Sequence, residues 1–461
     1  MGVTTVTEQS LTHLVDLADR FAASAREVDS TVTPNVELAQ WYAERQRDAA
    51  FEVTRIPLAD LVGWTINPQT GTLAHDSGRF FTVEGLRVQA PGYGWEQPIL
   101  VQREIGILGI LVKEFDGVLH CLMQAKVEPG NTGGLRLSPT VNATRTNYTG
   151  RQLPYVDAFV APREGQLLVD TLQSERSAWF LRKRNRHMVV EVTEPVQEHP
   201  DFRWLTLGQL RELLRRDRLL SMEACSVLSC LPVRPSGPPC DEFGDALLRS
   251  FTEGGRLRTR EVVSRLIEIK AREEVGQRRI PLNGIADWRI TPDGIARPDG
   301  RYFAVVGARV AVRGQGWTQP LLAPVPGGVA ALLTRDIDGV LHLLLAVRVE
   351  AGAMDVAELG PTVLCTPDNY RDDVRRPHFL DYVLSVAPHQ IRYDAAISEE
   401  GARFYHAHSR YLVIDTGPDF PVEVPDDYVW VTAGQAGALL QHSYYLNMQL
   451  RTLMAVLPEL L

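Results

Sequence analysis

The sequence predicts an α+β protein in which one mixed domain is present twice. Motifs recur in the same order in both halves, and each half contains apolar, β-branched stretches typical of buried strands. Each half also carries a helix-start pattern at a matching place. A length of 461 residues, with 44% apolar and 23% charged residues, suits a globular protein of two or more domains.

The internal repeat is visible directly in the sequence. GWEQP begins at Gly94 and GWTQP at Gly316, which is 222 positions later. SPTVNATRTNYTG begins at Ser138 and GPTVLCTPDNYRD at Gly360, with the same offset. A period this long is not that of a solenoid repeat, so it indicates a duplicated domain.

The repeat sets the predicted domain boundaries. We expect a helical lead over residues 1–34, a first repeat over 35–233, a linker over 234–255 and a second repeat over 256–461. The linker is predicted because RPSGPPCDEFG is rich in proline and glycine.

Individual elements follow from local patterns. LHCLMQAKV, from Leu119, and LHLLLAVRV, from Leu341, have the composition of buried strands. HMVVEV (187–192) and YLVIDT (411–416) are also predicted strands. TLGQLRELL, from Thr206, and TAGQAGALL, from Thr432, place Thr-x-x-Gln before an apolar helical pattern, which predicts a capping box.

Composition excludes several function classes. A net charge of −9 argues against general nucleic-acid binding, which depends on neutralising phosphates. No apolar run is long enough to span a membrane, and the N-terminus lacks a signal-peptide pattern, so we predict a cytoplasmic protein. The cysteines have no paired metal-ligand spacing and are predicted to be reduced and structural: Cys121, Cys225, Cys230, Cys240 and Cys365.

The most polar stretch of a structured region is SERSAWFLRKRNRHMVVEV (174–192). Ser174 is expected to cap a helix, and Glu175 suits the positive end of that helix. Lys183, Arg184 and Arg186 then precede a strand. This cluster could hold a diphosphate, because guanidinium groups match phosphate oxygens, or it could be a solvated helix end.

Alignment with the second half shows which of these charged residues occur only in the first repeat. Lys183 aligns with Ala407, and Arg145 aligns with Pro367. The residues around these two positions recur in the second repeat, as in the Asn-Tyr pair that begins at Asn369. We therefore predict that the first repeat carries the chemistry and that the second is degenerate.

The second repeat contains a histidine pair, which is a residue type that can bind a metal ion. His406 and His408 align with arginines, and no carboxylate or cysteine lies at a supporting spacing. We therefore predict no metal site and no cofactor.

Several motifs together resemble the NDP-4-keto-6-deoxyhexose 2,3-dehydratase family of antibiotic deoxysugar biosynthesis. They are QAKVEPGN, LSPTVNATRTNYTG, LLVDTLQSE, FLRKRNRHMVVEV and SMEACSVLSCL. The resemblance covers nearly the whole chain from about Val36. It implies two Nudix-like domains, a homodimer, dTDP-4-keto-6-deoxyglucose as substrate and a 3-ketoreductase as the next enzyme.

The reaction that the resemblance implies needs a base, a donor to a carbonyl oxygen and an acid. The predicted catalytic residues are Arg145, Tyr148, Glu175 and Lys183. The predicted substrate-binding residues are Thr144, Asn147, Tyr155, Gln173, Ser174, Trp179, Arg184 and Arg186. A second-repeat pocket is predicted from Asn369, Tyr370, Glu399, Arg403, His406 and Arg410.

Two other functions stay open at this point, a Nudix-type sugar-nucleotide pyrophosphohydrolase and a non-catalytic sugar-nucleotide binding protein. GRLRTREVVSRLIEIKAREEVG (255–276) matches several positions of the Nudix hydrolase signature. It has Ile269-Lys270 where Arg-Glu is required and precedes its repeat. We interpret the match as chance.

Overall fold

Two large mixed β-sheets form the framework of the computed structural model, which describes residues 8–149, 152–163, 166–232, 239–371 and 376–461. The first-repeat sheet contains β6 (Gly106–Phe115), β7 (Val118–Val127), β8 (Leu135–Ser138), β9 (Val141–Thr144), β10 (Leu167–Ser174), β11 (Arg184–Glu191) and β12 (Phe202–Thr206). The second-repeat sheet contains β18 (Gly328–Ile337), β19 (Val340–Val349), β20 (Ala357–Pro361), β21 (Val363–Cys365), β22 (Ile391–Ser398), β23 (His408–Asp415) and β24 (Tyr428–Thr432).

The two large sheets have the same topology. Their central strands run in the orders β10-β11-β6-β7-β12 and β22-β23-β18-β19-β24. One neighbouring pair in each sheet is parallel, β6 with β11 and β18 with β23. The four stretches predicted as strands correspond to β7, β19, β11 and β23, although β11 and β23 each end one residue earlier than predicted. These predictions and the mixed α+β class of a duplicated chain are confirmed.

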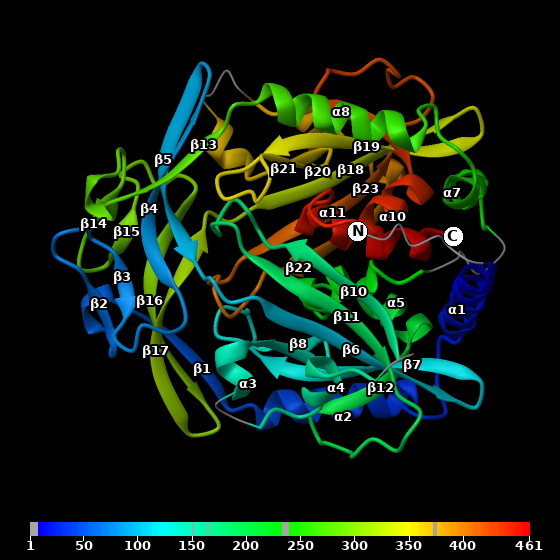
Figure 1. Ribbon diagram of the computed structural model, residues 1–461, viewed down its shortest axis with the longest axis horizontal. Coiled ribbons are helices and arrows are strands. Elements are labelled where there is room, and N and C mark those ends of the chain that lie inside the picture. Colours follow the sequence, from blue (N-terminus) through cyan, green and yellow to red (C-terminus); the bar gives the residue numbers. More distant parts are fainter. Residues whose placement is uncertain (1–7, 150–151, 164–165, 233–238, 372–375) are drawn as a thin grey trace.

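Two smaller sheets lie together at one side of the molecule (Figure 1). One contains β2 (Trp64–Ile66), β3 (Leu73–His75), β4 (Thr82–Ala90), β5 (Tyr93–Val101) and β13 (Gly276–Ile280). The other contains β1 (Phe51–Ile56), β14 (Arg289–Ile290), β15 (Gly294–Ala296), β16 (Phe303–Val312) and β17 (Gln315–Pro324). Each sheet therefore includes one strand from the other repeat.

This exchange is reciprocal. β1 of the first repeat pairs antiparallel with β16 of the second, and β13 of the second pairs antiparallel with β4 of the first. The small sheets consequently share one apolar core, which includes Trp64, Trp179, Trp288 and Phe404. Burial of large aromatic side chains is a strong stabilising contribution, and here it joins the two repeats.

Helices cover the large sheets, with α2 below and α8 above in the view of Figure 1. Those of the first repeat are α1 (Glu8–Arg26), α2 (Asn35–Asp48), α3 (Arg145–Thr149), α4 (Asp157–Val160), α5 (Leu207–Leu214) and α6 (Met222–Leu228). Those of the second are α7 (Glu242–Thr252), α8 (Thr259–Arg272), α9 (Leu380–Ser385), α10 (Ala433–Leu440) and α11 (Met448–Val456). Both predicted capping boxes are confirmed, at Thr206 before α5 and at Thr432 before α10.

The predicted lead and linker contain equivalent helices. In α1, the Ser24 hydroxyl accepts a hydrogen bond from the Leu207 amide at 2.9 Å, and in α7 the Ser250 hydroxyl accepts one from the Ala433 amide at 2.8 Å. α7 thus holds the same place against its repeat as α1 does. Residues 1–7 of the predicted lead and 234–238 of the predicted linker lie outside the described residues, as does residue 233 at the end of the predicted first repeat.

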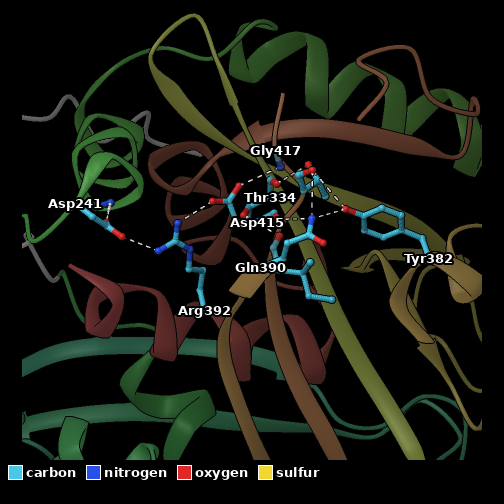
Figure 2. Close-up of polar contacts among 10 residues, drawn as sticks. Asp241, Thr334, Tyr382, Gln390, Arg392, Asp415 and Gly417 are labelled. Carbon is cyan, nitrogen blue, oxygen red and sulfur yellow. Dashed lines mark hydrogen bonds and ion pairs between the residues drawn. The ribbon is translucent and has the colours of Figure 1, made fainter. Parts of the chain in front are cut away.

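Figure 2 shows how α7 is attached to the second-repeat sheet. Asp241 caps α7 by accepting from the Gly244 amide at 2.8 Å, and its second oxygen accepts from Arg392 at 2.6 Å. Arg392 also donates to Asp415 at 2.9 Å, and Gln390 lies beside this pair and donates to the Tyr382 hydroxyl. The linker region is therefore a structured part of the second repeat.

The local predictions for this polar stretch are wrong. Ser174 does not cap a helix and Glu175 does not begin one, because Ser174 is the last residue of β10 and a turn follows it. Arg184 and Arg186 lie within β11 and do not precede it. The polar run that suggested a helix is explained instead by contacts with the second repeat, which are described below.

All five cysteines are free. No helix in the described part of the chain is both long and apolar enough to cross a membrane.

Candidate active site

Two related loops, one from each repeat, form contacts between the repeats. The first loop (175–183) follows β10, and the second loop (399–407) follows β22. The Gly130 amide donates to the Gly401 carbonyl at 2.6 Å, and the Gly352 amide donates to the Ser177 carbonyl at 2.7 Å. A Cβ on Gly130 would lie 1.7 Å from the Phe404 carbonyl oxygen, so the close approach requires glycine there. Each loop therefore contacts the opposite repeat.

A group of buried and half-buried charged side chains lies where the second loop meets the first repeat. We call it the first-repeat charged cluster and define it as Lys126, Glu128, Glu175, Lys183 and Glu400. Lys126 forms an ion pair with Glu128 at 3.0 Å, and Glu128 accepts from the Gly401 amide at 3.1 Å. Burial raises the pKa of Glu400, while the cations of the cluster oppose that rise.

Glu175 is the carboxyl at the start of the first loop, and its side chain is buried. One oxygen accepts from the Asn185 amide nitrogen at 2.6 Å. Burial raises the pKa of Glu175 to about 7, and the negative charge of Glu400 acts in the same direction. Such a carboxyl can both take up and release a proton near neutral pH.

Lys183 is the buried cation at the end of the same loop, and its backbone carbonyl accepts from the Glu175 amide at 3.0 Å. Burial lowers the pKa of Lys183, which the neighbouring Glu175 partly offsets. The ammonium group donates to the Glu104 carbonyl, and the Glu104 carboxylate in turn accepts from Thr146. Glu104 thus connects Lys183 to the segment that carries the other predicted catalytic residues.

That segment runs from the end of β9 through α3. Thr144 is half-buried and pairs with Gly106 of β6, while Arg145 and Asn147 are exposed. Tyr148 is half-buried and packs against an apolar cluster that includes Met188.

Other predicted binding residues lie in structural contacts. Tyr155 packs in the same apolar cluster as Tyr148 and donates to the Gln197 carbonyl at 2.6 Å. Gln173 donates to the Leu440 carbonyl at 3.1 Å, and Ser174 donates to Glu358 at 2.7 Å. Gln173 and Ser174 are buried between the repeats and hold them together.

The arginines predicted to bind the diphosphate differ in whether a carboxylate already holds their guanidinium group. Arg186 binds Asp170 through two hydrogen bonds of 2.6 and 2.7 Å, and Arg410 of the second repeat binds Asp394 in the same way. Arg184 is half-buried and contacts the sulfur of Met354 at 3.7 Å. The Arg186 pair is therefore a feature of both repeats.

A cavity of about 830 Å³ lies between the second repeat and the strands β4 and β5 of the first. We call it the second-repeat cavity. It is bounded by Arg348, Asn369 and Tyr370 of that repeat, and also by Arg176 and Trp179 from the first loop. The sequence-based prediction grouped Trp179 with the first repeat, whereas the structure places it in the wall of this cavity. The Arg176 guanidinium lies 4.0 Å from the centre of the Trp179 ring.

The remaining residues predicted for a second-repeat pocket, which are Glu399, Arg403, His406 and Arg410, do not line this cavity. Glu399 is buried and forms an ion pair with Arg176. Arg403 instead lies over the Phe81 ring at 4.6 Å, donates to Gln102 at 3.2 Å, and has Glu400 and Glu128 as its nearby charges. His406 is exposed and stacks on Tyr405 at 4.0 Å.

Comparison with known proteins decides the family. The family model for NDP-hexose 2,3-dehydratase matches residues 35–231 and again residues 259–457. The chain belongs to the NDP-hexose 2,3-dehydratase family. The two matches give the duplication that the sequence motifs predicted.

Curated relatives of this dehydratase cover almost its whole length. A protein of Saccharopolyspora spinosa is 46% identical over 96% of this chain and 95% of its own. One of Amycolatopsis orientalis is 45% identical over 95% and 93%, and one of Streptomyces violaceoruber is 43% identical over 93% and 98%. Each of the three is named dTDP-4-dehydro-6-deoxy-alpha-D-glucopyranose 2,3-dehydratase.

Sequence reasoning missed three members of the first-repeat charged cluster, Lys126, Glu128 and Glu400, and one neighbour, Asn185. Glu128 follows Lys126 in a Lys-Val-Glu stretch that recurs as Arg-Val-Glu in the second repeat, and this recurrence was a usable signal. Glu400 and Asn185 gave no such signal. Glu400 belongs to the other repeat, and Asn185 is replaced by Ser409 at the equivalent position.

Among the residues that the structure describes, no three His, Cys, Asp or Glu side chains form a group that could hold a metal ion.

Proposed function

We propose that this chain removes the C2 hydroxyl of dTDP-4-keto-6-deoxyglucose and that the first-repeat charged cluster performs the chemistry. The observation that carries the proposal is that two buried groups, Glu175 and Lys183, lie close enough to influence each other's charge, while their equivalents differ in the second repeat. Lys183 is replaced by Ala407, and Glu399 is held in an ion pair by Arg176. The names of the relatives support the substrate.

The C4 ketone of such a sugar acidifies the hydrogen on C3. In the proposed first step, the Glu175 carboxylate takes the C3 proton, and the electron pair of the C3–H bond forms an enolate with C4. Lys183, whose ammonium group donates to the Glu104 carbonyl, is the candidate hydrogen-bond donor to the developing oxyanion. Such preorganised donors are often the largest single contribution to catalysis of this kind.

In the second step, the enolate electrons form the C2–C3 double bond as the C2–oxygen bond breaks. The departing hydroxide is protonated to water, a role for which Tyr148 is the candidate acid. The C3 enol then tautomerises to a 3,4-diketone. Arg145, at the exposed start of α3, is the candidate for a second donor to the sugar carbonyl.

Fewer arginines are candidates for diphosphate binding than the sequence predicts. Arg184 stays a candidate for the diphosphate, together with Thr144 and Asn147 nearby in the first repeat. Arg186 would first have to give up its two bonds to Asp170. Trp179 would contact ligand only in the second-repeat cavity, with Asn369 and Tyr370.

The same proposal includes a Nudix-like ancestry for each repeat, a homodimer, a cytoplasmic location and a role in antibiotic deoxysugar biosynthesis. The diketone product requires a partner reductase that acts at C3, because an activated diketone must be reduced before it is transferred as a sugar.

The test is incubation of the purified chain with dTDP-4-keto-6-deoxyglucose. We expect loss of one water and a 2-deoxy-3,4-diketo product, trapped by a C3 ketoreductase and detected by mass spectrometry. Release of dTMP with added Mg²⁺ would indicate a pyrophosphohydrolase. Binding with the sugar left intact would indicate a non-catalytic binding protein. Either result would reject the proposal.

A further inference from the structure

We propose that Asn185 is a positioning residue whose side-chain amide fixes the Glu175 carboxyl for proton transfer. The inference rests on the proposed function of the first-repeat charged cluster. It adds a residue outside that cluster, and it explains why two equivalent glutamates of the two repeats would behave differently.

The hydrogen bonds of Asn185 allow its amide only one orientation. Asn185 lies on β11 and is 7% exposed. Its oxygen accepts from the Gly106 backbone amide at 2.8 Å, and its nitrogen donates to Glu175 at 2.6 Å. A backbone amide can only donate, so the oxygen must face Gly106 and the nitrogen must face the carboxyl.

Gly106 makes this arrangement possible. Asn185 and Gly106 are directly opposite in the parallel pair of β11 and β6. A Cβ at Gly106 would lie only 2.8 Å from the Asn185 oxygen, which is too close for an ordinary contact. The backbone of β6 therefore orients the Asn185 side-chain amide, and this amide in turn orients the Glu175 carboxyl.

Among its described residues, the second repeat has no equivalent of the hydrogen bond from Asn185 to Glu175. Ser409 lies opposite Gly328 there, and Glu399 is bound by the Arg176 guanidinium. A guanidinium stabilises the carboxylate by its full charge, whereas a neutral amide orients a carboxyl without neutralising it. Only the first-repeat glutamate is thus both oriented and free of a direct guanidinium partner among the contacts of the described residues.

The charges around Glu175 come from three further elements. Glu400 approaches from the second loop, Arg451 from α11 and Lys183 from the end of the first loop. Burial and Glu400 raise the pKa of Glu175 to about 7, and the Asn185 hydrogen bond opposes this rise. Removing the amide should therefore raise the pKa of Glu175 further and leave less carboxylate available as base.

The experiment compares Asn185→Ser and Asn185→Asp with wild type in the full-length enzyme. Asn185→Ser introduces the residue that the second repeat has at this position, so we expect it to fold. Asn185→Asp keeps the size and the acceptor for Gly106 and replaces the donor with a carboxylate. Both should lower kcat at pH 7 by about tenfold or more with little change in KM. Both should move the acidic limb of the kcat–pH profile to higher pH by about one unit.

Two further variants separate this inference from the proposed function. Asn283→Ser removes an exposed amide that donates to a backbone carbonyl at 3.1 Å, and it should leave kcat and the pH profile unchanged. Glu175→Gln should abolish turnover. If Glu175→Gln is inactive while both Asn185 variants keep the wild-type profile, the positioning role is wrong. If Glu175→Gln turns over at the wild-type rate, the proposed function of Glu175 fails first.

Discussion

At the residue scale, the two repeats differ most where buried charge is concentrated. Lys183 and Glu175 are both buried, and each changes the electrostatics of the other. A buried charge is costly unless it is paired or hydrogen-bonded, so such pairs are candidates for function as well as for structure. The second repeat has Ala407 in place of Lys183, so the cost of burying this particular cation is absent there.

Lys183→Ala should lower kcat by about 10²–10³-fold, because it removes a donor to the developing oxyanion. Arg145→Ala should also lower turnover, and both can be assayed beside His406→Ala of the second repeat. Circular dichroism of each variant would show whether the fold is kept. If His406→Ala abolishes turnover while Lys183→Ala and Arg145→Ala do not, the second repeat is the working copy.

At the element scale, α10 shows how close packing fixes some glycines and not others. Gly434 and Gly437 lie three residues apart in this helix. A Cβ on Gly434 would be 2.7 Å from the Phe251 carbonyl oxygen, whereas a Cβ on Gly437 would meet no atom within 4 Å. In the first repeat the equivalent positions are Gly208 and Arg211. The first repeat therefore has glycine at the position of Gly434 and a large side chain at the position of Gly437.

Gly437→Ala should therefore raise the free energy of unfolding by about 0.5–1 kcal/mol, because alanine loses less backbone entropy in a helix. Gly434→Ala should lower it by about 1–3 kcal/mol, because the backbone of α7 must move. Urea denaturation followed by circular dichroism would measure both. Equal effects of the two substitutions would show that packing against α7 does not distinguish them.

At the scale of the whole molecule, the repeats are joined by exchanged strands, a shared aromatic core and crossed loops. Ser174 of the first repeat donates to Glu358 of the second, and Arg136 of the first donates to Ser398 of the second at 3.3 Å. Arg451 is fully buried and donates to Ser226 of the first repeat at 2.8 Å. We therefore expect the two repeats to unfold in one cooperative transition.

The Glu358 carboxyl at this contact gives stability a pH dependence. Burial raises the pKa of Glu358 to about 7, against an ordinary value of 4.5. Between these values the folded state binds one more proton than the unfolded state, so this group lowers stability as pH rises toward 7. Glu358→Gln removes that effect. The variant should gain up to about 2 kcal/mol relative to wild type between pH 5 and pH 7.

Denaturant unfolding at several pH values would measure this difference. Glu268→Gln, which removes an exposed carboxyl of α8, is the matched control and should differ from wild type by only a few tenths of a kcal/mol. A difference between Glu358→Gln and wild type that does not change with pH would contradict the expected protonation of Glu358.

The sequence alone determined the duplication, the strands around LHCLMQAKV and LHLLLAVRV, both capping boxes and the family. These features depend on local patterns or on the order of motifs, and a single chain records both. Only the tertiary structure decided that β1 and β13 exchange sheets, that Trp179 faces the second-repeat cavity, and that Glu400 joins Glu175. The two repeats carry similar strands and loops, so the sequence cannot distinguish pairing within a repeat from pairing between repeats. That choice depends on contacts between residues far apart in the chain.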